Sequence, residues 1–210
     1  MPENEESLNQ TRLFERNPIL NLGGNCHGLC CNFTLYCMKH WNENTEDILH
    51  GWNKKLKKNI YAEHPSDRFA ERTHQFQFMQ DAYKKHRQGI KIEEDASFVE
   101  SLFGVRNGES ESPGSNMIGL DFPSAGGGHI IEIVKRRDGY LIYDPNDDEL
   151  RFAEIHEKAD RIINSRARGQ YQFFTDFHII AMDEYLRSID MIGTMGKPKR
   201  KDEQFRAKLA

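Results

Sequence analysis

The chain has 210 residues, enough to bury a substantial core, and this length fits one domain or one domain with an elaborated edge. A formal net charge of -4 gives no overall attraction to nucleic acid or to an anionic membrane, and the sequence contains no run of about 18 apolar residues that would span a membrane. We therefore expect a soluble protein whose function lies in a localised site.

The chain opens with MPENEESLNQTRLFERNPIL, which carries acidic side chains where a secretory signal needs positive charge. No apolar segment of the signal type follows, so classical secretion is not expected. Residues 1–18 are predicted to form a polar arm, residues 19–192 the functional domain, and residues 193–210 a polar and basic tail.

The first half of the chain is predicted to be mainly helical. Apolar residues follow Cys26 at three- and four-residue intervals, which is typical of an amphipathic helix that begins at this cysteine. They are Leu29, Phe33, Tyr36 or Cys37, and Trp41. Further helices are expected at about 45–60 and 66–88, and a shorter one in SFVESLFG.

The second half is predicted to be mainly an antiparallel sheet. RNGESESPGSN, residues 106–116, concentrates loop-forming residues and separates the two halves. After it come MIGLDF, HIIEIVKR, YLIYD, ELRFAE and, beyond a helix near 154–166, QYQFFTDFHIIAM, all rich in strand-forming residues. Helices followed by strands predict an α+β fold, with a helical N-terminal half packed on a C-terminal antiparallel β-sheet and two layers meeting along a cleft.

Cys26 lies in GGNCHGLCCNF, at the expected start of the first helix. The unpaired N–H groups and the dipole at a helix N-terminus favour a thiolate, and the flanking glycines leave room for a substrate. Three interpretations stay open: a nucleophile, a metal ligand together with Cys30 and Cys31, or a small buried apolar residue.

Two further signals lie in the predicted sheet. His129 follows three glycines at the start of the HIIEI strand, where it would be held by the sheet and open to the cleft. Asp144 ends the next strand, and Pro145 blocks its continuation. Each signal alone also has an ordinary interpretation, as a surface or capping histidine and as a turn aspartate.

Pairing the two strands as a hairpin makes the combination more specific. An even loop length places His129 and Asp144 on the same face. A two-residue loop at Asp138 and Gly139 would leave them about 13 Å apart along the strand, at roughly 3.3 Å per residue. A four-residue loop over 136–139 places Asp144 opposite Ile131 and roughly halves this offset, so we favour the longer loop.

The blocks GGNCHGLCCNFTLYCMKHW, GGGHIIEI and GYLIYDPNDDELRF resemble the Cys, His and Asp blocks of the YopT/AvrPphB family of papain-like cysteine peptidases, bacterial proteins delivered into host cells. The resemblance implies a papain-like fold in which Cys26 is the nucleophile, His129 its base and Asp144 the residue that orients His129. It also implies an asparagine five residues before the cysteine. Asn21 stands there as a candidate oxyanion-hole donor, and Asn25 is the competing candidate.

The predicted activity is a peptidase acting on a host-cell protein, in the cytosol and delivered there by a bacterium. A deamidase, or an acyltransferase of transglutaminase type, would use the same triad through the same thioester, and an idle papain-like module that binds a host protein is the non-enzymatic alternative. No cofactor is required.

No metal is expected, because no second cysteine pair or spaced histidine pair accompanies the four cysteines. The clustering of these cysteines within one short segment indicates reduced thiols rather than disulfides, and Cys30, Cys31 and Cys37 are expected to pack in the helix core. The lysine-rich runs at 53–58 and 197–201 are expected to be solvated, without the interleaved aromatic residues of nucleic-acid binding.

Overall fold

The computed structural model describes most of the region between Cys26 and Leu186. The described residues are 26–61, 69, 72–73, 75–76, 88–90, 97–103, 114–121, 128–147, 150–170, 176–182 and 185–186. Within them, no helix combines the length and the apolar composition that a membrane crossing needs. The predicted arm, the predicted tail, Asn21 and Asn25 lie outside these residues.

The predicted helices are confirmed where they fall on described residues. Helix α2 spans Cys26–Lys39, α3 spans Thr45–Tyr61 and α6 spans Phe98–Phe103. Helix α7 spans His156–Asn164 and continues into a π-helix, Ser165–Gln170. The first helix therefore has Cys26 as its first residue, as its hydrophobic spacing predicts.

An antiparallel sheet forms the centre of the part of the chain that the structure describes. Its six strands run in the order β1-β6-β2-β3-β4-β5, and all five pairings are antiparallel. The bounds are β1 Gln88–Ile90, β2 Gly114–Asp121, β3 Gly128–Arg136, β4 Gly139–Tyr143, β5 Arg151–Ala153 and β6 Asp176–Ala181. The α+β class is confirmed. The loop predicted over 106–116 is wrong at its end, because residues 114–116 already belong to β2.

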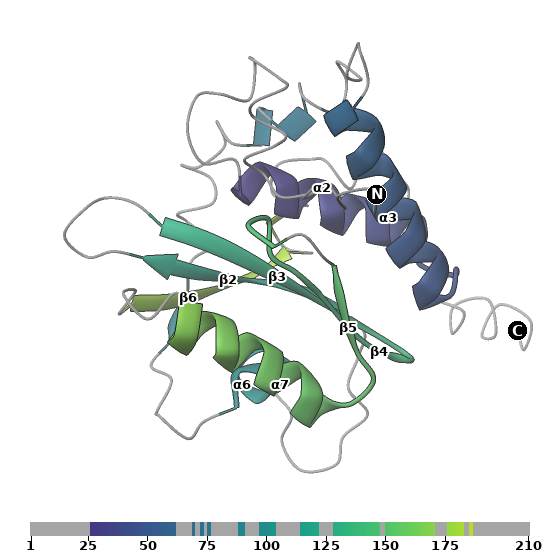
Figure 1. Cartoon of the computed structure of the whole chain (residues 1–210). Coiled ribbons are helices and arrows are strands. Elements are labelled where there is room, and N and C mark those ends of the chain that lie inside the picture. The colour runs from purple at the N-terminus through teal and green to yellow at the C-terminus, as the bar shows by residue number, and fades with distance from the viewer. Residues whose placement is uncertain are drawn as a thin grey trace, which may run out of the picture.

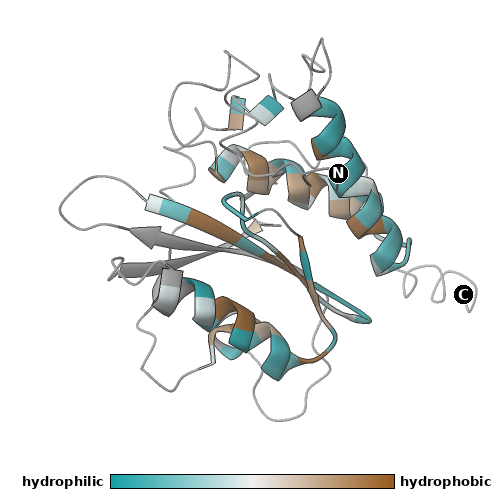
Figure 2. Cartoon of the chain, in the orientation of Figure 1, coloured by the Kyte–Doolittle hydropathy of each residue, from teal (hydrophilic) through white to brown (hydrophobic). Residues whose placement is uncertain are grey.

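Helices cover both faces of the sheet, so the prediction of two layers is wrong (Figure 1). Helices α2 and α3 lie over one face and α6 and α7 over the other. The apolar residues of β3 and β4 alternate between two cores. Ile130, Val134, Leu141 and Tyr143 pack with α2 and α3, whereas Ile131, Ile133, Tyr140 and Ile142 pack with α6 and α7. This two-sided packing explains why every residue of β3 after Gly128 is buried. The brown part of its ribbon marks its apolar residues (Figure 2).

The β3–β4 hairpin has the predicted register but a shorter loop. Arg136 pairs with Gly139, and Glu132 pairs with Tyr143, so the next residue along, Asp144, comes level with Ile131 as predicted. The loop itself contains two residues, Arg137 and Asp138, instead of four. The tighter turn has a φ of 141° at position 139. Gly139 adopts this conformation readily, whereas residues with a side chain do not.

Candidate active site

The N-terminus of α2 is held in place by contacts with Thr73. Gly28 lies so close to the chain at Thr73 that a Cβ on the glycine would be 2.2 Å from the Thr73 carbonyl oxygen. One turn further along, Asn32 Nδ2 donates a hydrogen bond of 2.6 Å to Thr73 Oγ1. These contacts fix the first two turns of the helix and with them the position of Cys26, which is 7% exposed.

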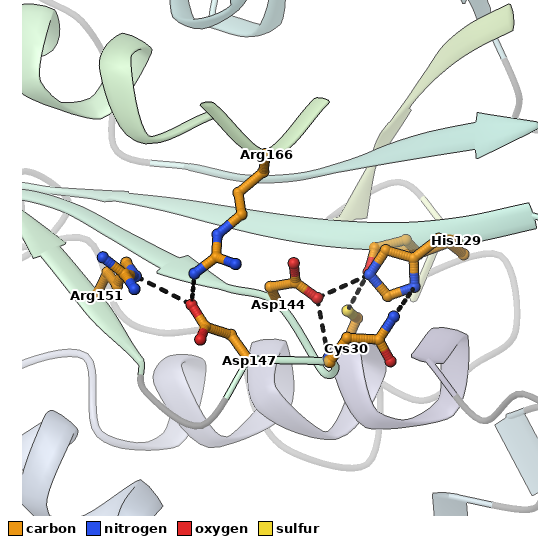
Figure 3. Close-up of polar contacts among 8 residues, drawn as sticks. Cys30, His129, Asp144, Asp147, Arg151 and Arg166 are labelled. Atoms are coloured by element: carbon orange, nitrogen blue, oxygen red, sulfur yellow. Dashed lines mark hydrogen bonds and ion pairs between the residues drawn. The ribbon is translucent and has the colours of Figure 1, made fainter. Parts of the chain in front are cut away.

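Two hydrogen bonds attach the other side of α2 to β3. The Cys30 thiol donates to the carbonyl oxygen of Ile130 at 3.8 Å, and the Thr34 hydroxyl donates to Glu132 Oε1. Because Ile130 follows His129 directly, the first of these bonds brings the start of the helix close to the histidine. Figure 3 draws the bond from Cys30 as a dashed line.

His129 and Asp144 form a buried hydrogen-bonded pair. His129 is 5% exposed and Asp144 3%, and His129 Nε2 donates to Asp144 Oδ1 at 2.7 Å. The two side chains point toward one another in Figure 3. The hairpin register therefore does bring these two sequence-predicted residues together.

The segment Asp144-Pro145-Asn146-Asp147 forms a turn that fixes the carboxylate of Asp144. The backbone N–H of Asp147 donates to the Asp144 carbonyl oxygen at 2.9 Å, and the backbone N–H of Asn146 donates to Asp144 Oδ1 at 2.9 Å. Pro145 supplies the fixed φ that the second turn position requires. The same Asp144 oxygen thus accepts from His129 and from the backbone of the turn. Asp144 therefore both forms the turn and contacts His129.

Cys26 completes the group, because its side chain is hydrogen-bonded to His129. Burial of His129 disfavours its charged form, but the hydrogen bonds to Asp144 and Cys26 and the negative charges of these two groups outweigh burial and raise its pKa to about 9. The raised pKa of His129 therefore favours the charged form of the ring beside Cys26. Nε2 is engaged by Asp144, which leaves Nδ1 for Cys26.

No protein-family model matches the chain, and no curated protein matches it significantly. Among solved structures, the crystal structure of the Pseudomonas avirulence protein AvrPphB is similar, at 12% sequence identity. The match covers 76% of this chain and 92% of that chain, with a TM-score of 0.49. A likeness of this size carries no conclusion about the activity of this chain, which must come from the residues of the site.

The other three cysteines are packing residues of α2, as predicted. Cys30, Cys31 and Cys37 are buried free thiols. Burial raises the pKa of each well above its ordinary value, and the negative charge of Glu132 raises it further. Among the described residues, no group of three or more His, Cys, Asp or Glu is placed to hold a metal ion.

His27, the neighbour of Cys26, is buried and only 2% exposed. Its ring lies against Tyr185, and its Nε2 is 3.6 Å from Cys31 Sγ. Burial lowers its pKa to about 4, although a hydrogen bond with the backbone of Phe76 partly opposes this. His27 is therefore a neutral core residue that does not line the site.

Sequence reasoning missed three contacts at the Asp144 turn. Asn146 Nδ2 lies 3.4 Å from His129 Nδ1, the nitrogen opposite Asp144. Asp147 Oδ2 accepts from Arg151 Nε at 3.0 Å and from Arg166 Nη2 of the π-helix, as Figure 3 shows. The Asp-Pro-Asn-Asp run was visible in the sequence, but Asn146 and Asp147 themselves gave only a turn signal.

A second grouping of Ser97, His156 and Asp160 has the residue types of a serine hydrolase triad without its geometry. His156 Nε2 lies 2.9 Å from Ser97 Oγ and 3.2 Å from Asp160 Oδ2, so a single ring nitrogen faces both partners. A triad needs the histidine to use one nitrogen for each. Ser97 Oγ instead accepts from the backbone N–H of Glu100 at 3.0 Å, as a cap of α6.

Proposed function

We propose that this protein is a papain-like thiol hydrolase, and specifically a cysteine peptidase, with Cys26 as nucleophile, His129 as acid and base, and Asp144 as the residue that orients His129. One observation carries the proposal: Cys26, the first residue of α2, is hydrogen-bonded to His129, whose other nitrogen donates to Asp144 at 2.7 Å. A nucleophile, a base and a third group that orients the base are the three parts that thiol catalysis requires.

Acylation follows from the charges of this group. Cys26 Sγ attacks the carbonyl carbon of the substrate, and the carbonyl oxygen becomes an oxyanion. The backbone N–H of Cys26 lies in the first turn of α2, where N–H groups have no partner within the helix and favour negative charge. We assign it to the oxyanion hole together with the side-chain amide of Asn21. The imidazolium then protonates the leaving amine from Nδ1, and the C–N bond breaks.

Deacylation uses the neutral ring that acylation leaves behind. A water molecule attacks the thioester carbon, one of its protons passes to His129 Nδ1, and the C–S bond breaks with its electron pair returning to Sγ. Asp144 stays bonded to Nε2 throughout and keeps the ring orientation. No step needs a cofactor. The proposed substrate is a protein of a host cell, as the resemblance of the Cys, His and Asp sequence blocks implies.

The test is a reactivity and a product measurement on the full chain. A limiting dose of a thiol-directed epoxide inhibitor should add one inhibitor mass, mapped to Cys26, and Cys26→Ala should add none. Incubation with a host-cell protein extract, followed by labelling of new N-termini, should reveal cleavages that Cys26→Ala lacks. Labelling at Cys26 with products that gain one mass unit and no new N-termini would identify a deamidase instead. Absence of labelling at Cys26 would contradict every thiol-enzyme function.

A further inference from the structure

Asn146 lies beside the nitrogen of His129 that faces the nucleophile. Its Nδ2 is 3.4 Å from His129 Nδ1, while Asp144 holds Nε2 at 2.7 Å. The amide nitrogen is a donor only, so a hydrogen bond at this position requires a lone pair on Nδ1. A donor at this position therefore favours the neutral ring, with its proton on Nε2, over the imidazolium, which presents a second N–H at Nδ1.

We propose that Asn146 is a positioning residue that stabilises neutral His129 with a lone pair on Nδ1, the form that hydrolyses the acyl-enzyme. This inference rests on the proposed function. It assigns Asn146 to the second half of the reaction, whereas the ion pair of Cys26 and His129 serves the first half.

The two halves of the reaction need opposite forms of the same ring. Before acylation the ring must be charged, to stabilise the thiolate and to protonate the leaving group. After acylation the sulfur belongs to a neutral thioester and no longer stabilises the positive charge on His129. The carboxylate of Asp144 still stabilises that charge. Of the described residues, Cys26 on α2 and Asp144 in the turn are the ones whose charges act on His129. The Asn146 donor at Nδ1 opposes the remaining influence of Asp144 and favours the neutral ring. Asn146 gives up the Nδ1 lone pair to the attacking water when the ring acts as the base.

The position of Asn146 does not depend on its own side chain. Its backbone N–H donates to Asp144 Oδ1 at 2.9 Å, and the turn is closed by the backbone N–H of Asp147. Substitution of the side chain keeps both bonds. Asn146→Asp has the same shape, replaces the donor with an acceptor and adds a negative charge beside Nδ1, which favours the imidazolium. Asn146→Ala removes the donor without adding charge.

The experiment uses p-nitrophenyl acetate, which acylates the thiol and releases a coloured product, so that a burst reports acylation and the steady state reports deacylation. In Asn146→Asp we expect the burst to be kept, and the steady state at pH 7 to fall about tenfold as the pH midpoint of deacylation rises by about one unit. Asn146→Ala should shift the midpoint in the same direction by less. Asn42→Asp adds the same charge at an exposed position of the α2–α3 loop and should behave as wild type.

The outcomes separate this inference from the function on which it rests. A wild-type chain without a burst at Cys26 overturns the proposed function and this inference with it. A normal wild-type burst with an unchanged deacylation midpoint in both Asn146 variants overturns the inference alone, as does an equal loss of both phases at every pH, which indicates a structural role. A second readout needs no turnover: on a Cys26→Ala background, the NMR titration of His129 should move to higher pH when Asn146→Asp is added, and no movement contradicts the inference.

Discussion

His129 Nε2 and Asp144 Oδ1 are 2.7 Å apart, although fifteen residues separate them in the sequence. The β3–β4 register creates this proximity, and the Asx turn at Asp144 holds the carboxylate in place through the backbone of Asn146. Because the same carboxylate oxygen accepts both bonds, the orientation of the His129 ring is coupled to the geometry of the turn.

Asp144→Asn should retain more activity than Asp144→Ala. The asparagine carbonyl oxygen can still accept from His129 Nε2–H and from the Asn146 backbone, so ring orientation is kept, although the charge that raises the pKa of His129 is lost. The alanine loses both bonds, and we expect its rate to fall on the order of 100-fold. Steady-state rates and an NMR titration of His129 on both variants provide the measurement, and equal full activity in both would remove Asp144 from the mechanism.

Cys26 should be the only cysteine alkylated by iodoacetamide in the native protein at pH 6. Cys26 lies at the start of α2 beside His129, whereas burial and the charge of Glu132 hold the pKa values of Cys30, Cys31 and Cys37 well above their ordinary range. Peptide mapping after a short exposure identifies the labelled site, and unfolded protein provides the control in which all four cysteines react alike. Equal labelling of Cys30 and Cys26 in the native state would contradict the assignment of the nucleophile.

Asn21→Ala should reduce turnover without changing alkylation of Cys26, because alkylation forms no oxyanion. Loss of one preorganised donor costs on the order of 100-fold in rate, or about 3 kcal/mol. Asn25 adjoins the nucleophile, so Asn25→Ala should disturb alkylation and turnover together. Parallel alkylation, turnover and melting measurements separate the two residues. Wild-type turnover in Asn21→Ala would transfer the oxyanion role to Asn25 or to backbone groups alone.

The parts of the fold that follow from local pattern were predictable from the sequence. Apolar spacing after Cys26 predicts the start of α2, and the parity of the β3–β4 hairpin predicts that His129 and Asp144 share a face. The loop length was not predictable, because the two-residue turn depends on the backbone conformation of Gly139, whose φ is 141°.

Contacts between distant segments were not predictable in the same way. An amphipathic pattern shows that α7 buries one face, but it does not show against which side of the sheet the helix packs. The layer formed by α6 and α7 was therefore not predicted. Helical spacing predicts one buried stripe on α2, whereas this helix is covered on several sides and buries neighbouring residues such as Cys26 and His27 alike. The contact of Asn146 with His129 joins a turn to a strand, and no periodicity encodes it.

Gly28→Ala should destabilise the protein and also reduce the reactivity of Cys26. The new Cβ would lie 2.2 Å from the backbone oxygen of Thr73, so α2 or the segment at Thr73 has to move, at a cost of about 1–3 kcal/mol. Because the first turn carries Cys26, this movement changes its distance to His129. Gly169→Ala is the matched control, since nothing lies within 4 Å of its added Cβ. Urea unfolding and the alkylation rate should change for Gly28→Ala and stay near wild type for Gly169→Ala.

Two buried histidines should give the protein a stability maximum near pH 6.5. His129 has its pKa raised from 6.5 to about 9, so between these values the folded state holds one proton more than the unfolded state, and stability falls as pH rises. His27 has its pKa lowered from 6.5 to about 4. Between these values the unfolded state holds the extra proton, and stability falls as pH decreases. Each slope approaches about 1.4 kcal/mol per pH unit.

Denaturant unfolding of the wild type, His27→Gln and His129→Gln across pH 4 to 9.5 tests these two slopes. The slope of the unfolding free energy against pH is the quantity to compare, because either substitution also changes packing and lowers the absolute stability. His27→Gln should flatten the acid side and leave the alkaline side unchanged. His129→Gln should flatten the alkaline side alone, and the stability that His129 contributes should be fully present below pH 6.5 and lost as pH rises through about 9. An alkaline slope that survives in His129→Gln would show that another group, and not the ring beside Cys26, binds the proton.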